Sequence, residues 1–133
     1  MSYFNLASYF YDISDKYANK VAIIYKEKDV SYSELNKLSN KIANYFLAIG
    51  IKAYDVVGIF NTKDSMGYAS MLACLKIGAT YTNIDEKNPL IRLEKILATC
   101  EPQLLVSDHN PSELIKSVSK KLDIKLVDFS MDG

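Results

Sequence analysis

The sequence is poor in the residues that build several common kinds of site. Its 133 residues include two cysteines, three prolines, five glycines, one histidine and no tryptophan. Cys74 and Cys100 are too few and too far apart for a disulfide framework or a zinc site, so we expect reduced thiols and a cytoplasmic protein. The glycines never occur as Gly-x-Gly, and no Gly-Lys-Ser/Thr is present. A glycine-rich phosphate loop is therefore not expected in this chain.

A charge excess of one sign is also missing. Sixteen basic residues balance sixteen acidic ones, which argues against a nucleic-acid partner. Arg92 is the only arginine, whereas readers of phosphates and bases usually depend on arginine forks. No apolar run approaches the ~20 residues that span a bilayer, and the N-terminus, Met1 to Asn5, does not resemble a signal peptide. We expect neither nucleic acid nor membrane as a partner.

What the sequence does contain is a steady alternation of strand and helix patterns. Apolar, β-branched segments of strand length are followed by segments with helical periodicity, and the strands begin 20 to 24 residues apart. This rhythm is typical of parallel strands joined by right-handed helical crossovers. Strands are predicted at 56–60, 80–84, 104–107 and 124–129, and helices at 64–77, 89–99 and 111–121. Asn88-Pro89 and Asn110-Pro111 open the last two helices, with asparagine as the cap and proline at the first helical position. The prediction is one α/β domain over residues 1–133, flavodoxin-like, with a mostly parallel sheet and helices on both faces.

The N-terminal third predicts a small hairpin and two further helices. Residues 21–25 and 30–32 form the hairpin strands, and an apolar stripe over 3–17 indicates a helix. The best-marked helix runs from Ser31 to Ile49. Ser31 and Glu34 have the spacing of a capping box, and Gly50 suits a left-handed C-terminal cap. Its predicted buried face is Leu35, Leu38, Ile42, Phe46 and Ile49.

The reactive side chains have plain structural interpretations. His109 follows Asp108, which permits a proton relay, but no nucleophile accompanies it, so we interpret it as a loop residue. Cys74 lies among apolar helical residues and is expected in the core, and Cys100 stands beside Glu101, which would oppose thiolate formation.

Two loops after predicted strands are the better candidates for a site. Asp85 and Glu86 follow one strand, and residues 61–64, Asn-Thr-Lys-Asp, follow the strand before it. In α/β sheets ligands gather at this carboxyl edge. The structural interpretation is that Asp85 organises a turn and that Asp64 or Thr62 caps a helix, since such loops need caps in any case. We therefore assign no catalytic, cofactor-binding or metal-binding residue.

Two segments of the chain together resemble a known family. Ser31-Tyr32-Ser33-Glu34-Leu35 resembles the first core motif of adenylate-forming (AMP-binding) enzymes. Leu75-Lys76-Ile77-Gly78-Ala79, followed by Tyr81, Asp85, Pro89, Arg92 and Leu93, resembles the second. The similarity covers about residues 18–108 and is greatest to amino-acid-activating members, such as nonribosomal peptide synthetase adenylation domains and D-alanine carrier-protein ligases. Asn83 departs from the pattern, because the family usually has proline there.

The resemblance implies what the parent enzyme does. It would be an ATP- and Mg-dependent ligase that activates a carboxylate, an amino acid, as an acyl adenylate and passes the acyl group to the thiol of a phosphopantetheinyl carrier protein. The family's phosphate loop, ribose-binding aspartate and catalytic lysine have no counterpart in residues 1–133. We therefore expect an N-terminal scaffold fragment that binds no cofactor and is inactive alone.

Two alternatives remain open. The chain could be a self-contained flavodoxin-like binding or interaction module without catalysis, using the loops 61–64 and 85–88. It could also be a regulatory or oligomerising remnant. A piece of a larger domain exposes apolar surface meant for the rest, so the fragment could self-associate.

Overall fold

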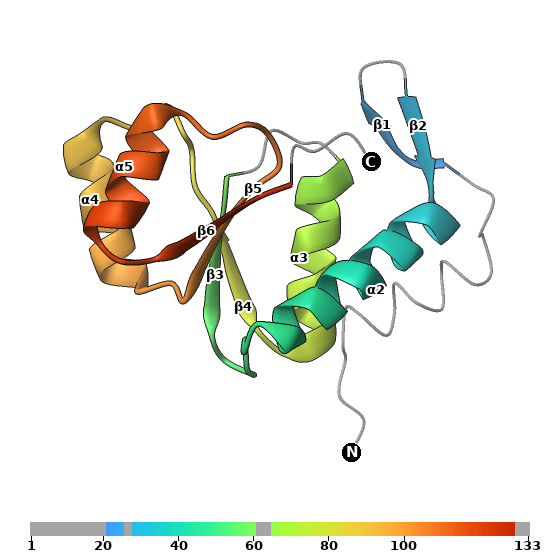
Figure 1. Ribbon diagram of the computed structural model, residues 1–133. Coiled ribbons are helices and arrows are strands. Elements are labelled where there is room, and N and C mark those ends of the chain that lie inside the picture. Colours follow the sequence, from blue (N-terminus) through green and yellow to red (C-terminus); the bar gives the residue numbers. More distant parts are fainter. Residues whose placement is uncertain (1–20, 26–27, 61–64, 130–133) are drawn as a thin grey trace.

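The computed structural model describes residues 21–25, 28–60 and 65–129 (Figure 1). The predicted helix over 3–17 and the loop 61–64 lie outside the described residues. Within them, strand and helix alternate as the sequence pattern indicates. The elements that follow helix α2 (Tyr32–Ala48) are β3 (Val56–Phe60), α3 (Ser65–Ile77), β4 (Thr80–Asn83), α4 (Leu90–Cys100), β5 (Leu104–Ser107), α5 (Glu113–Lys121) and β6 (Lys125–Asp128).

The predicted hairpin is present, with one shifted strand. Strand β1 (Val21–Tyr25) pairs antiparallel with β2 (Lys28–Ser31). The second strand was predicted over 30–32, but it begins at Lys28 and ends at Ser31, because Tyr32 already opens helix α2 (Tyr32–Ala48). Ser31 is thus both the last strand residue and the helix cap, which joins the hairpin directly to the helix.

Both predicted ends of α2 are confirmed. The Ser31 hydroxyl accepts a hydrogen bond from the Glu34 amide at 3.1 Å. At the other end Gly50 has φ = +96°, and the amides of Gly50 and Ile51 donate to the carbonyls of Leu47 and Phe46. This is the Schellman arrangement, which suits glycine because it has no Cβ. It places buried Ile51 beside buried Phe46, as the sequence predicted.

The four strands of the main sheet are all parallel, in the order β4-β3-β5-β6. The first strand of the series therefore lies inside, and the chain reverses direction across the sheet between β3 and β5. Helices α2 and α3 cover one face, and α4 and α5 cover the other (Figure 1). The predicted flavodoxin-like α/β architecture with helices on both faces is confirmed.

The sheet separates two apolar cores. Val57, Ile59, Leu104 and Val106 point to α2 and α3. Phe60 and Leu105 point to α4 and α5, where they meet Leu93 and Ile115. The alternation follows from the two-residue period of a strand. The inner strands are almost fully buried, whereas the side chains of β4 and β6 are half-buried or exposed.

Lys76 joins the two segments that resemble the family motifs. Its ammonium, on α3, donates to Oδ1 of Asn36 at 2.7 Å, Oγ of Ser39 at 2.8 Å and Oδ1 of Asn40 at 2.7 Å, all on α2. Burial lowers the pKa of Lys76, but four oxygen acceptors, including the Asn36 carbonyl, compensate for lost water. The first motif helix is thereby fixed to the second.

Two predicted helix caps are wrong in detail. Asn88 was expected to cap α4 and Asn110 to cap α5, each with proline at the first helical position. The cap of α4 is Pro89, which makes no side-chain cap bond, and Asn88 instead bonds the Asp85 carbonyl. The cap of α5 is Ser112, whose hydroxyl accepts from the Ile115 amide. Ser112 therefore caps α5 in place of the predicted Asn110.

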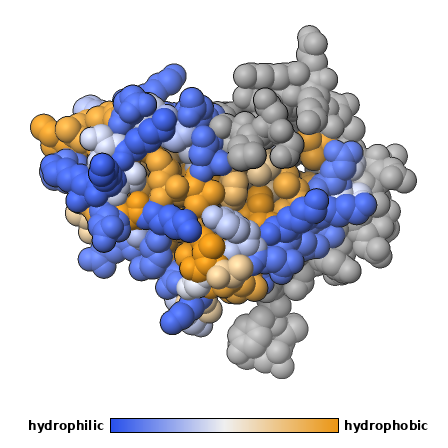
Figure 2. Space-filling view, viewed as in Figure 1, coloured by the Kyte–Doolittle hydropathy of each residue, from blue (hydrophilic) through white to orange (hydrophobic). Residues whose placement is uncertain are grey.

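Figure 2 shows hydrophobic surface in the middle of the face where β6 crosses, with hydrophilic surface on both sides. Leu126 and Val127 of β6 are half-buried and belong to the two opposite cores. Among the described helices, none combines the length and apolarity needed to cross a bilayer.

Candidate functional site

A cavity of about 620 Å³ opens at the carboxyl edge of the sheet. Its floor is apolar, with Phe60 from the end of β3 and Ile84 after β4. Its rim is polar and consists of Asn83, Asp85, Glu86, Lys87 and His109. Because parallel strands end at the same edge, the end of β3 and the connections that follow β4 and β5 bring these residues to one place. The cavity lies beside the β3–β5 reversal point, where open α/β sheets bind ligands.

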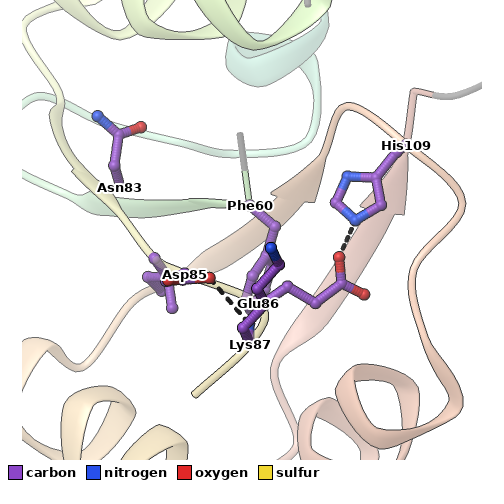
Figure 3. A pocket seen from close by; sticks show the side chains of 7 residues that line it. Phe60, Asn83, Asp85, Glu86, Lys87 and His109 are labelled. Carbon is purple, nitrogen blue, oxygen red and sulfur yellow. Dashed lines mark hydrogen bonds and ion pairs between the residues drawn. The ribbon is translucent and has the colours of Figure 1, made fainter. Parts of the chain in front are cut away.

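Asp85 has the turn-forming role that the sequence predicted. Its Oδ1 accepts the Lys87 amide at 2.9 Å, and its carbonyl accepts the Asn88 amide at 3.2 Å. This side chain–backbone bond is the usual reason for aspartate in a turn. It fixes the β4–α4 loop so that Glu86 points toward His109 (Figure 3).

Glu86 and His109 form the centre of the site, and this pairing was not predicted. The imidazole Nε2 faces Oε2 of Glu86, and Nδ1 lies 2.9 Å from Oδ1 of Asp108 (Figure 3 shows the first contact). The other Glu86 oxygen, Oε1, accepts the Ser112 amide at 3.0 Å, at the start of α5. His109 lies in the loop after β5, as the sequence indicated, and its ring also bridges two carboxylates from two loops.

The electrostatics of the pair favour the charged forms. Partial burial lowers the pKa of His109, but hydrogen bonds to Asp108 and Glu86 and their negative charges raise the pKa more, so the net direction is upward from 6.5. Burial raises the pKa of Glu86, but bonds from His109 and Ser112 and the imidazolium charge outweigh it, so the net direction is downward from 4.5. Both shifts favour an imidazolium held between two carboxylates.

This arrangement is built for positioning, not for nucleophilic catalysis. Ser107 lies 3.3 Å from Nδ1 of His109, yet it is fully buried and its hydroxyl donates to the His109 carbonyl. Such a hydroxyl cannot reach a substrate. The described residues also contain no cluster of three or more histidine, cysteine or acidic side chains able to hold a metal ion. The residues Asn61 to Asp64, the other predicted loop, lie outside the described part.

The two cysteines should differ sharply in reactivity. Burial raises the pKa of the Cys74 thiol to about 12, whereas Cys100 at the end of α4 is partly exposed. Because the thiolate is the reactive form, we expect iodoacetamide at pH 8 to label Cys100 and to leave Cys74 unmodified in the folded protein. Peptide mass spectrometry measures both, and labelling in urea should reach both equally. Equal labelling without urea would contradict the buried placement of Cys74.

Comparison with known proteins decides the family. The AMP-binding enzyme profile matches residues 10–132. The chain belongs to this family. It has the fold of the family's N-terminal part, as the motif resemblance indicated. The chain is 27% identical over 119 residues to tyrocidine synthase 1 of Brevibacillus parabrevis, a match that covers 90% of this chain and 11% of the relative.

Solved structures agree on the fold. The luciferase-like enzyme of the mealworm Zophobas morio superposes with a TM-score of 0.86 at 20% identity, over 97% of this chain and 31% of that one. An artificially fused adenylation–PCP di-domain from Klebsiella oxytoca, NpsA-ThdA, superposes with a TM-score of 0.78 at 21% identity, over 95% and 23%. The chain thus spans only a minor part of these proteins' length.

Proposed function

We propose that this chain of the AMP-binding enzyme family is the scaffold of an adenylating enzyme. The parent would activate an amino acid with Mg-ATP, release pyrophosphate, and transfer the acyl group to the thiol of a phosphopantetheinyl carrier protein. The observation that carries the proposal is the family match over residues 10–132. The carrier partner is supported by the likeness to a protein made as an adenylation–PCP fusion, and we expect both to act in the cytoplasm.

Within such an enzyme these residues have a structural role. Stabilising phosphates in transfer needs cations and amide clamps, and the described carboxyl edge offers carboxylates that are already engaged by His109, Lys87 and Ser112. The motif residues build the frame: Leu35 and Leu93 are buried, Gly78 has φ = +78°, and Lys76 joins α3 to α2. The chain therefore holds a wall of the site while other parts of the enzyme bind ATP.

The first test is an ATP–pyrophosphate exchange assay on residues 1–133 alone. With Mg-ATP and each of the twenty amino acids, we expect no exchange above background, because the phosphate-binding groups lie elsewhere in the parent. An intact adenylation domain assayed in parallel is the positive control. Amino-acid-dependent exchange by the isolated chain would overturn the scaffold assignment.

The second test concerns the parent. We expect the reading frame after Gly133 to encode a Gly/Ser/Thr-rich loop with a lysine, and the whole translated protein to show amino-acid-dependent exchange. A stop codon at that point would instead favour the second candidate, a self-contained binding or interaction module that uses the cavity at the carboxyl edge.

The oligomerising alternative has its own test. Self-association through the hydrophobic face over β6 would appear in light scattering as a molecular mass that rises with protein concentration.

A further inference from the structure

One side chain connects two loops of the cavity rim. His109 belongs to the β5–α5 loop and Glu86 to the β4–α4 loop, and their strands are not neighbours, because β3 lies between them. The imidazole crosses the end of β3 to reach Glu86, and both residues line the cavity (Figure 3). The position of the rim therefore depends on whether this contact is made.

Glu86 carries the contact onward to a helix. Its Oε1 accepts the Ser112 amide at 3.0 Å, while its Oε2 faces the imidazole. The Ser112 hydroxyl in turn accepts from the Ile115 amide at the first turn of α5. A carboxylate is well placed at a helix start, where the amides point outward. The loop of β4, the imidazole and the start of α5 thus form one connected unit.

The two carboxylates differ in their access to water. The Asp108 side chain is 0% exposed, whereas Glu86 is 25% exposed and His109 is 26% exposed. When the ring loses a proton, only one nitrogen keeps its hydrogen. A buried carboxylate against a bare nitrogen lone pair would be costly, so the remaining proton should stay on Nδ1, toward Asp108. The lone pair of Nε2 then faces Glu86, which can turn to water.

We propose that His109 is a proton-controlled latch that holds Glu86 across the end of β3 and releases it when the ring becomes neutral. In the closed state the β4–α4 loop and the start of α5 are tied together at the cavity rim. In the open state Glu86 is a free carboxylate facing the cavity. The device lies outside the adenylation chemistry proposed above and does not depend on it.

The other charged side chains that the structure describes at this edge do not contact the His109 ring in place of Glu86. Asp85 and Lys87 lie on the same loop as Glu86 and are joined through the Asp85 carboxylate and the Lys87 amide. On α5, Glu113 pairs with Lys116. On β6, Asp128 is the register partner of Ser107. Residues 61–64, which include Lys63 and Asp64, follow β3 outside the described part.

The pH dependence of the latch follows from the opposite pKa shifts of His109 and Glu86. The His109 pKa is raised, so the stabilisation is complete below 6.5 and is lost as the pH rises through the folded value. The Glu86 pKa is lowered, so its contribution is complete above 4.5 and is lost as the pH falls through its folded value. Both contributions are therefore complete between about pH 4.5 and 6.5, and the latch opens as the pH rises through the raised pKa of His109.

Nuclear magnetic resonance on the full chain tests this directly, because His109 is the only histidine. We expect its imidazole ¹⁵N signals to titrate with a midpoint above 6.5 and the neutral ring to carry its proton on Nδ1. Over the same range, the hydrogen-exchange protection of the Ser112 amide should fall roughly tenfold, as for the loss of one charge-assisted bond. The Glu34 amide, bonded to Ser31 in α2, is the internal reference and should not change.

Two variants separate the latch from general loosening. Glu86→Gln keeps an acceptor for Ser112 but removes the charge, so the histidine midpoint should fall and Ser112 protection should no longer follow it. Glu113→Gln, 92% exposed on the same helix, should behave like wild type. A wild-type midpoint at or below 6.5, a neutral ring protonated on Nε2, or Ser112 protection that is constant through the titration would each overturn the proposal. These wild-type readings decide the matter even if Glu86→Gln does not fold.

Discussion

Ile42→Asp is expected to leave the chain largely unfolded, whereas Lys41→Asp is expected to leave its stability nearly unchanged. Ile42 is 4% exposed and belongs to the core on the α2 and α3 side of the sheet, and Lys41, its neighbour in sequence, is exposed. The substitution removes about 1.5–3 kcal/mol of apolar burial and adds several kcal/mol for an unpaired buried carboxylate. The sum is comparable with a typical domain's whole stability of ~5–15 kcal/mol.

Circular dichroism with urea unfolding measures both variants. For Lys41→Asp the free energy of unfolding should stay within about 0.5 kcal/mol of wild type, as for most surface changes. Similar losses for the two variants would show that α2 does not pack as described. Because both introduce the same residue one position apart, helix propensity largely cancels from the comparison.

The second large effect is expected at the centre of the sheet. Leu105→Ala should destabilise the chain by about 2–5 kcal/mol, whereas Leu114→Ala should cost far less. Leu105 is 0% exposed in β5, and Leu114 is 37% exposed on α5. Both changes remove the same atoms, so the difference reports burial and the cavity left behind.

Thermal unfolding is a suitable measurement, with an expected fall in Tm of roughly 10 °C or more for Leu105→Ala. The core around Leu105 is tight. A Cβ built on Gly58 would lie 2.7 Å from the Leu105 side chain and 2.9 Å from the Ile84 side chain, so Gly58→Ala added to Leu105→Ala would still meet Ile84. A cost for Leu114→Ala as large as that for Leu105→Ala would argue against the assigned core.

Much of the fold could be predicted because local signals agree with one another. In α2 the apolar period, the Ser31 cap and Gly50 all specify the same helix, and its ends are where they were expected. Strands β3 and β5 match their predicted bounds, since continuous apolar runs mark buried strands. The caps of α4 and α5 were misplaced because asparagine before proline and serine after it are both good caps, and only the path of the chain chooses between them.

The candidate site was harder to predict than the fold. Asp85 acts within its own turn, so its role could be read locally. The Glu86–His109 contact joins residues 23 positions apart, on loops that follow two strands that do not pair. The strand order β4-β3-β5 places these two loops at the same edge of the sheet. The available signal was a lone histidine and a glutamate that each follow a predicted strand. Recognising it required the strand order, which spacing alone does not determine.

The division of the sheet's two faces constrains how this segment can change over evolutionary time. Leu104 and Val106 serve one core and Leu105 serves the other. Inserting or deleting one residue within β5 would move every following side chain of the strand to the opposite face of the sheet. Length changes should therefore be confined to the connections, such as the turn at 85–89, while β5 itself can vary only by substitution.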